Sequence, residues 1–373
     1  MASIRIRILS SFQRFSKIIS PSIHHAKPSG ALLSKRELSS ESHSDHPFPS
    51  VKGRNFLTLK NFTSDEIHYL LWCAADLKAR FKDPNWKYLS ESFSPLSGKS
   101  AALIFLKRST RTRISMETGL SLLGCQPVFL TDKDIHLGVN ENIYDTARVL
   151  SGFVDIILAR VNKQEEVESL ANNATVPVVS GLSDLYHPLQ ILADLQTLQE
   201  HFGSLYNHTV AWVGDGNNIL HSFLMAAPKM GMKLQIATPK GYDPDPEILK
   251  DAMEFAKEFK TTIELTRDPR EACEKADVVV TDTWVSMGQE EESAARLKAF
   301  QGYQVNKELM SLTNQDSVFL HCLPRHPEEV TDDVFYSEKS LIWQEAENRK
   351  WTAMAVMLCL LENHTPNIPM PTF

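Results

Sequence analysis

The 373-residue sequence has no apolar stretch near the length of a membrane-spanning helix, which requires about 20 residues. We therefore expect a protein without membrane-spanning helices. Cysteine is also scarce: five residues, an odd number, occur at scattered positions without the paired spacing of zinc ligands. This pattern argues against a disulfide framework and a cysteine-based metal site, so we expect reduced thiols and no metal. The five are Cys73, Cys125, Cys273, Cys322 and Cys359.

Acidic residues are absent from the first 36 positions, which carry seven Lys or Arg residues and many serines. This is the composition of an organelle transit peptide, and we predict a cleaved leader over residues 1–45, with the cut between Glu37 and Val51. Because arginine is prominent and early, we expect delivery to the mitochondrial matrix. A basic arm that binds nucleic acid is the alternative. Without residues 1–36 the chain has 32 basic and 46 acidic residues, a net charge of −14, which gives no support for a nucleic-acid partner.

A complete dinucleotide fingerprint is also missing. Gly214 and Gly216 follow an apolar run and form a Gly-x-Gly turn. The third glycine of the Gly-x-Gly-x-x-Gly pattern would fall at position 219, where the chain has Ile219. We therefore do not expect this turn to bind NAD.

Short apolar runs recur along the chain, and amphipathic stretches of helical length separate most of them. The runs lie at 101–105, 154–158, 176–179, 210–213, 234–237, 278–281 and 318–320. This alternation predicts an α/β protein with parallel sheets. Ahead of the first run, Thr63 and Glu66 form a capping-box pattern that predicts the start of a helix.

The length is enough for about two domains. Residues 189–201 have a helical pattern that Gly203 would terminate, and we interpret them as the link between the domains. We place the first domain at 52–185 and the second at 186–343. A final helix is expected from Glu345 to about Glu362.

The most informative stretch is Ser-Thr-Arg-Thr-Arg at 109–113, between an apolar run and an amphipathic segment. This context predicts a strand, a tight turn and a helix N-terminus, where backbone N–H groups, hydroxyls and guanidiniums gather as a phosphate requires. Alone, the stretch could equally be a helix cap with a solvated basic face. Three further polar motifs lie beside apolar runs: His-Pro-Leu-Gln at 187–190, Asp-Thr-Trp-Val-Ser-Met-Gly at 282–288 and His-Cys-Leu-Pro-Arg at 321–325.

With these four motifs in this order, the chain resembles the carbamoyltransferase family over about residues 52–373. The first two motifs occur across the family, and the last two are narrower and point to ornithine as the acceptor. The resemblance implies an α/β fold of two doubly wound parallel-sheet domains, with the active site in the cleft between them, and a C-terminal segment, 344–373, that packs back on the first domain. It also implies transfer of a carbamoyl group from carbamoyl phosphate to the side-chain amine of L-ornithine, giving L-citrulline and phosphate, as in the urea cycle and arginine biosynthesis. A homotrimer is implied as well, and no cofactor.

The resemblance also implies a set of residues for carbamoyl phosphate. Arg160, His187 and Thr112 are expected to donate hydrogen bonds to the carbonyl oxygen, and each such donor typically contributes about 3–4 kcal/mol of transition-state stabilisation. Gln190 is expected to contact the carbamoyl amide, and His136 to reach the phosphate of a neighbouring subunit. The full set is Ser109, Thr110, Arg111, Thr112, His136, Arg160, His187, Gln190, Cys322, Leu323 and Arg349.

For ornithine, the resemblance implies contacts with Asn218, Asp282, Ser286 and Met287. Asp282 would pair with the α-ammonium group, and the other three would bind the α-carboxylate. Cys322 would lie beside the attacking amine and position it without forming a covalent bond. An amine like that of lysine has a pKa of about 10.4, so its neutral form at pH 7 lies roughly 4.6 kcal/mol uphill. We therefore expect turnover to rise from pH 7 toward pH 9.

One position departs from the family pattern. Family members usually carry a glutamate two residues before the arginine that precedes the first motif, and this chain has Leu106 there. The change puts catalytic efficiency and trimer geometry in question. Three alternatives stay open: aspartate as acceptor, which Asp282 and Cys322 disfavour; putrescine, which lacks the α-groups; and a binding-only relic, which rests on Leu106 alone.

Overall fold

The computed structural model describes residues 50–84, 93–133, 142–286 and 290–373. The expected leader, His136 and Met287 lie outside these ranges. The described residues form one compact unit that contains two parallel β-sheets. Within the described ranges no helix combines the length and the hydropathy needed to cross a membrane.

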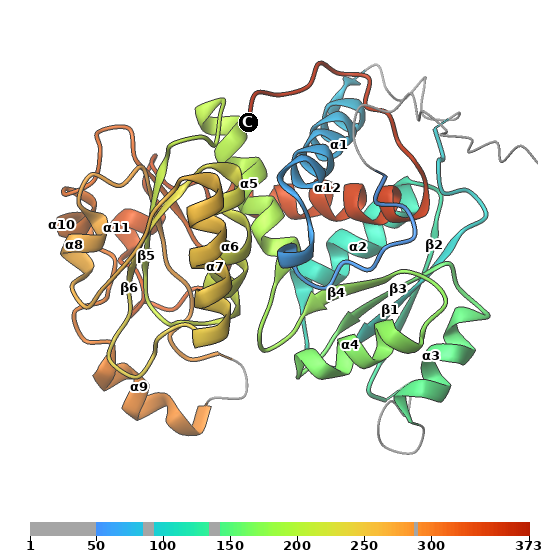
Figure 1. Ribbon diagram of the computed structural model, residues 1–373, viewed down its shortest axis with the longest axis horizontal. Coiled ribbons are helices and arrows are strands. Elements are labelled where there is room, and N and C mark those ends of the chain that lie inside the picture. The colour runs from blue at the N-terminus through green and yellow to red at the C-terminus, as the bar shows by residue number, and fades with distance from the viewer. Residues whose placement is uncertain (1–49, 85–92, 134–141, 287–289) are drawn as a thin grey trace, which may run out of the picture. The chain divides into compact units, whose positions relative to one another are not determined.

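The first sheet has four parallel strands in the order β2-β1-β3-β4. Its strands are β1 (Ser100–Phe105), β2 (Gln126–Thr131), β3 (Ile156–Arg160) and β4 (Val178–Leu182). Helices cover both faces, as parallel sheets require (Figure 1). One face packs against α3 (Ile143–Ser151) and α4 (Gln164–Asn173), and the other against α1 (Ser64–Lys82), α2 (Thr110–Leu122) and α12 (Ile342–Leu361).

The second sheet has five parallel strands in the order β7-β6-β5-β8-β9. Its strands are β5 (Thr209–Val213), β6 (Lys233–Ala237), β7 (Ile263–Thr266), β8 (Val278–Val280) and β9 (Val318–Leu320). Figure 1 shows α6 and α7 on one side of it and the short helices α8, α10 and α11 on the other. The helices are α6 (Asn218–Ala226), α7 (Pro246–Phe259), α8 (Pro269–Cys273), α9 (Ser293–Ala299), α10 (Lys307–Met310) and α11 (Asp332–Phe335).

Two helices connect the sheets. α5 (Pro188–Phe202) runs from the first sheet to the second and ends at Gly203, whose φ of +79° is the left-handed conformation that favours glycine. α12 packs against α1, α2 and α5. Its approach to α2 depends on Gly119, because a Cβ there would lie 2.6 Å from Cγ of Met354.

The predicted fold class is confirmed: two parallel-sheet α/β domains of the doubly wound kind. Each of the seven apolar runs overlaps a strand, and the capping box of Thr63 and Glu66 begins α1. Two strands, β2 and β7, were not predicted. The final helix begins at Ile342, three residues before the predicted Glu345. The domain boundaries at 185 and 343 stay a prediction.

The strand order places two of the polar motifs, those at 109–113 and 282–288, at switch points, where neighbouring strands lead to opposite sides of the sheet. In the first sheet the switch lies between β1 and β3, which end at Phe105 and Arg160. In the second it lies between β5 and β8, which end at Val213 and Val280. The loops that leave these ends carry the phosphate-type motif and the Gly-Asp-Gly and Asp282 turns, so ligand-binding crevices are expected there.

Candidate active site

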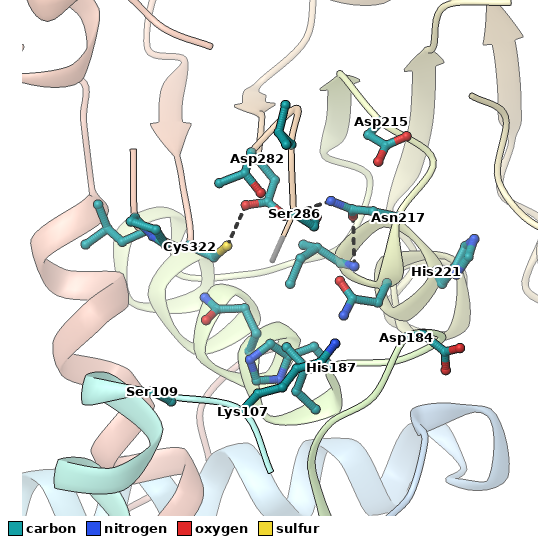
Figure 2. Close-up of a pocket in the computed structure, with 18 of the residues that line it drawn as sticks. Lys107, Ser109, Asp184, His187, Asp215, Asn217, His221, Asp282, Ser286 and Cys322 are labelled. Atoms are coloured by element: carbon teal, nitrogen blue, oxygen red, sulfur yellow. Dashed lines mark hydrogen bonds between the residues drawn. The ribbon is translucent and has the colours of Figure 1, made fainter. Parts of the chain in front are cut away.

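A cavity of about 990 Å³ lies at the carboxyl ends of both sheets (Figure 2). Every predicted site residue that the structure describes lines it, so the four sequence motifs converge in one place. These residues are Ser109, Thr110, Arg111, Thr112, Arg160, His187, Gln190, Asn218, Asp282, Ser286, Cys322, Leu323 and Arg349.

The N-terminus of α2 forms one wall of the cavity. Ser109 is the N-cap residue, and its Oγ accepts a hydrogen bond of 3.2 Å from the backbone N–H of Thr112. The Thr112 side chain is buried, and its Oγ1 accepts a hydrogen bond of 2.9 Å from Nη2 of Arg349. The predicted strand, turn and helix start around residues 109–113 are therefore present, and this 13-residue helix directs its positive dipole end at the cavity.

Three arginines come to this wall from separate elements. Arg111 lies in the first turn of α2, Arg160 ends β3, and Arg349 lies on α12. Burial, followed by repulsion from neighbouring arginines, lowers the pKa of Arg160 and of Arg349 to about 10 each. The Nε atoms of both are buried without a hydrogen-bond partner among the described residues. Buried cationic donors that repel one another and lack partners are the features of an anion site.

His187 lies beside this cluster as the N-cap residue of α5. Burial, together with Arg349 and Arg160, lowers the pKa of its imidazole well below the usual value, so the ring is neutral near pH 7. Its Nε2 lies 3.3 Å from Nη1 of Arg349, and arginine can only donate. Nε2 is therefore the acceptor, and Nδ1 carries the proton without a partner among the described residues.

On the opposite wall, polar side chains are bonded to one another. The Cys322 thiol donates to Oδ1 of Asp282 at 2.9 Å, and Nδ2 of Asn217 donates to Oδ2 at 2.8 Å, the chain of contacts drawn in Figure 2. Burial and the Asp282 charge raise the pKa of the Cys322 thiol well above its usual value. A protonated thiol is a poor nucleophile, so this environment suits a polar contact better than covalent catalysis.

The two asparagines after β5 have different partners. Asn218, the predicted ligand, lines the cavity, but its Nδ2 donates to the Ser183 carbonyl at 2.7 Å. Asn217 was not predicted as a site residue from the sequence. Its Nδ2 donates a hydrogen bond to Asp282, and its Oδ1 accepts hydrogen bonds from the first turn of α6. The signal was present, because Asn217 follows a strand at the N-cap position of a helix.

Several other lining residues were also missed, among them a buried ion pair. Asp215 and Arg296 lie 3.0 Å apart, and Arg296 also donates to the Trp284 carbonyl at 3.0 Å. Burial raises the pKa of Asp215 to about 6 in spite of the arginine. This pair joins the turn after β5 to the segment that carries Ser286. The sequence places its members 81 positions apart, so only the fold reveals it.

Leu106 lies at the end of β1, outside the cavity lining. It is partly buried against an apolar cluster that includes Ile104 and Ile157, and its backbone N–H donates to the Arg160 carbonyl at 2.9 Å. The backbone contact that holds the end of β3 is therefore independent of the side chain at 106.

One group of side chains has a metal-capable donor set. Atoms of Asp282, His321 and Cys322 all lie within 4.8 Å of one another. Both His321 nitrogens are already bonded, Nδ1 to the Leu323 N–H and Nε2 to Glu329, each at 3.0 Å. Because the thiol is bonded to Asp282 as well, a metal would have to displace these hydrogen bonds.

Comparison with known proteins identifies the class. The carbamoyl-P binding domain of aspartate/ornithine carbamoyltransferases matches residues 54–200, and the Asp/Orn binding domain matches residues 206–360. The chain belongs to the aspartate/ornithine carbamoyltransferase family.

Within that family the chain is similar to ornithine carbamoyltransferases. The chain is 58% identical to the mitochondrial ornithine transcarbamylase of Gallus gallus, over 87% of this chain and 90% of that protein. It is 57% identical to the mitochondrial ornithine carbamoyltransferase of Aquarana catesbeiana, over 87% and 92%. The ornithine carbamoyltransferase structure from Pyrococcus furiosus has a TM-score of 0.80 at 44% identity, covering 85% of this chain and all of that one. The chain therefore stands with the ornithine carbamoyltransferases.

Proposed function

We propose that this protein transfers the carbamoyl group of carbamoyl phosphate to the side-chain amine of L-ornithine, giving L-citrulline and phosphate. One observation carries the proposal: unpartnered, buried donors of Arg160, Arg349 and His187 converge on one cavity with the Asp282–Cys322 pair. The first group suits a phosphorylated carbonyl compound, and the second suits a cationic amine. Family membership supports both halves.

The carbamoyl phosphate side supplies positive charge where negative charge develops. The α2 N-terminus, Ser109, Thr110 and Arg111 bind the phosphate, and Leu323 contributes through the carbonyl that accepts from Arg111. Arg160, Thr112 and the Nδ1–H of His187 face the carbonyl oxygen and stabilise the oxyanion of the tetrahedral intermediate. Arg349 holds Thr112, His187 and Gln190 in place while it contacts the substrate.

The acceptor side binds ornithine in the orientation that the reaction needs. Asp282 pairs with the α-ammonium group, and Asn218, Ser286 and Met287 bind the α-carboxylate. Cys322 accepts a contact from the neutral side-chain amine. The amine nitrogen attacks the carbonyl carbon, the C–O bond to phosphate breaks, and the proton lost by the nitrogen leaves with the phosphate as HPO₄²⁻.

Citrulline formation tests the proposal. The full chain, and in parallel a chain that starts at His46, receives carbamoyl phosphate with ornithine, putrescine, N-acetylornithine or aspartate. Rapid turnover with ornithine alone is the expected result. Turnover with another amine overturns the roles of Asp282 and Asn218, and no turnover with any acceptor favours the binding-only relic.

We also propose a homotrimer with shared sites. β2 is an edge strand, and its neighbourhood exposes the apolar side chains of Ile114 (52%), Leu122 (40%) and Val128 (41%). An unpaired, apolar edge favours association with another chain. If His136 completes a neighbour's site, mixing and reassembling inactive His136→Ala and Arg160→Gln chains restores part of the activity. Verified hybrids that stay inactive contradict shared sites.

The mitochondrial matrix is the proposed location, supported by the basic leader and by mitochondrial relatives at 48–58% identity. Import of the full chain into isolated mitochondria, with cleavage between Glu37 and Val51, is expected. A chain without residues 1–45 serves as the control and should remain outside.

A further inference from the structure

Two buried acidic side chains lie directly behind Gln190. Asp194 on α5 and Glu345 on α12 are each 1% exposed, and neither lines the cavity. Asp194 is one helical turn beyond Gln190 on α5, and Glu345 is one turn before Arg349 on α12. Two i, i+4 pairs on adjacent helices therefore face each other.

Hydrogen bonds between these helices fix the orientation of the Gln190 amide. Its Nε2 donates to Oδ1 of Asp194 at 2.7 Å and to Oε1 of Glu345 at 2.8 Å. Its Oε1 accepts from Nη1 of Arg349. The amide nitrogen has two hydrogens, and both are used in these bonds. If the Gln190 amide were flipped, its oxygen would face the carboxylate oxygens of Asp194 and Glu345. Oε1 is held on the Arg349 side and keeps a second lone pair.

The two carboxyl groups also lie next to each other, because both accept a hydrogen bond from the same Gln190 nitrogen. Burial raises the pKa of Asp194 to about 7, and burial and the Asp194 charge raise that of Glu345. The charged or titratable groups that face the pair are Arg349 on α12, Asp282 after β8 and Cys322 after β9. Of these three groups only Arg349 favours the charged forms of the acids, and burial of two adjacent carboxyl groups opposes a charge on both at once.

The two acids have different hydrogen-bonding demands. Glu345 receives an N–H at each oxygen, because its Oε2 also accepts from the backbone N–H of His321 at 3.0 Å. Asp194 receives a side-chain or backbone N–H at Oδ1 alone, among the described residues. A glutamine at 345 has one NH₂ group in place of a carboxylate oxygen. In either amide orientation this NH₂ would face an N–H donor, that of Gln190 or the backbone N–H of His321. An asparagine at 194 would keep one acceptor and offer its NH₂ to Glu345.

We propose that Asp194 and Glu345 form a positioning pair, which orients Gln190 so that its Oε1 accepts a hydrogen bond from the carbamoyl amide. Through the His321 N–H, the same pair links this amide contact to the turn that carries Cys322. Neither acid touches substrate. The inference rests on the proposed function, because carbamoyl phosphate supplies the amide.

The isosteric variants Asp194→Asn and Glu345→Gln test the pair, because each replaces one carboxyl group by an amide at a site of equal burial. Glu345→Gln is expected to weaken carbamoyl phosphate binding by about 10- to 100-fold, the effect of a buried donor left unpaired. Asp194→Asn is expected to weaken it by about two- to threefold only, since its network is retained. Glu200→Gln is the matched control: Gln196 and Glu200 form the same i, i+4 pair at 2.9 Å on α5, away from the cavity.

Calorimetric titrations compare carbamoyl phosphate with inorganic phosphate, which lacks the amide. Glu345→Gln should keep phosphate affinity within about twofold of the unmodified chain, which also shows that the variant is folded. If Glu345→Gln does not fold, Asp194→Ala takes its place, because it removes an acceptor of Gln190. Asp194→Ala is expected to weaken carbamoyl phosphate about tenfold and phosphate not at all.

The proposal is overturned if Asp194→Asn and Glu345→Gln lose the same affinity for carbamoyl phosphate. It is also overturned if Glu345→Gln loses as much affinity for inorganic phosphate as for carbamoyl phosphate. These outcomes are separate from failure of the proposed function, which would appear as an unmodified chain that forms no citrulline. Near-normal affinity for carbamoyl phosphate in Asp194→Asn, together with loss of this affinity in Glu345→Gln, supports the positioning pair.

Discussion

The two walls of the cavity differ in how their polar groups are occupied. On the carbamoyl phosphate wall, Nε of Arg160, Nε of Arg349 and Nδ1 of His187 are buried without partners among the described residues. On the acceptor wall, both oxygens of Asp282 are bonded, one to Cys322 and one to Asn217. The first wall has its donors in place for an anion, whereas the second must exchange internal bonds for contacts with a substrate.

This difference indicates where each kind of energy enters the reaction. In the proposed reaction, preorganised donors need no rearrangement as charge develops on the carbonyl oxygen, so we expect the first wall to contribute mainly to transition-state stabilisation. Exchange of one hydrogen bond for another changes the free energy little, so we expect the second wall to contribute mainly to selection of the correct amine. Variants on the two walls should therefore have different kinetic signatures.

The largest effect is expected for Arg160→Gln on the carbamoyl phosphate wall. Loss of an oxyanion donor should lower kcat/KM for carbamoyl phosphate about 100- to 1,000-fold, mostly through kcat. Steady-state citrulline assays measure this. Arg270→Gln, which removes an exposed arginine paired with Glu308, is the control and should stay near the unmodified value. A loss confined to KM contradicts the oxyanion role.

Asp282→Asn should affect the other substrate. Without the carboxylate, the α-ammonium group loses its charged partner, and we expect kcat/KM for ornithine to fall about 10- to 100-fold. Affinity for inorganic phosphate, measured by calorimetry, should be unchanged because the anion wall is intact. A parallel loss of phosphate affinity would show that the two walls do not act separately.

Cys322→Ser is expected to lower kcat only about tenfold, because a hydroxyl can replace a thiol in a polar contact. The raised pKa keeps the thiol protonated through pH 9, so the thiol does not titrate over this range. We expect the predicted rise in turnover from pH 7 to 9 to come from deprotonation of the ornithine amine and to persist in the variant. pH–rate profiles of both proteins decide this, and a flat profile in the variant assigns the titration to the thiol.

Leu106→Glu should have the smallest effect. The new carboxylate would lie against a partly buried apolar cluster and should lower the free energy of unfolding by about 1 kcal/mol. The backbone bond to the Arg160 carbonyl is retained, so kcat/KM should change by less than about threefold. Urea denaturation and citrulline assays measure the two quantities. A large gain in activity would show that Leu106 limits the enzyme.

In the two described sheets, the sequence predicted every interior strand and the edge strands β4 and β9, but not the edge strands β2 and β7. β1, β3, β5 and β8 are buried on both faces, so they read as continuous apolar runs. β2 and β7 are edge strands, and residues such as Gln126 and Glu264 are exposed. Their partners, more than their own composition, place them in the sheets, so no single-sequence pattern predicted them.

The candidate site divides in a similar way. Residues in compact motifs, such as Arg111 and His187, could be selected from the sequence and do line the cavity. The supporting partners could not, because their contacts join distant positions: Asn217 with Asp282, Asp215 with Arg296, and Gln190 with Glu345. These pairs exist only once the strand order has brought the loops together.

The position of α12 has a consequence for protein synthesis. Arg349 and Glu345 sit in the first turns of the last helix, yet their partners Thr112 and Gln190 are made much earlier. A chain still being translated can form both sheets while its anion site lacks an arginine. The nascent chain would then become able to bind an anion only at the end of synthesis, when the final helix leaves the ribosome and packs against α1, α2 and α5.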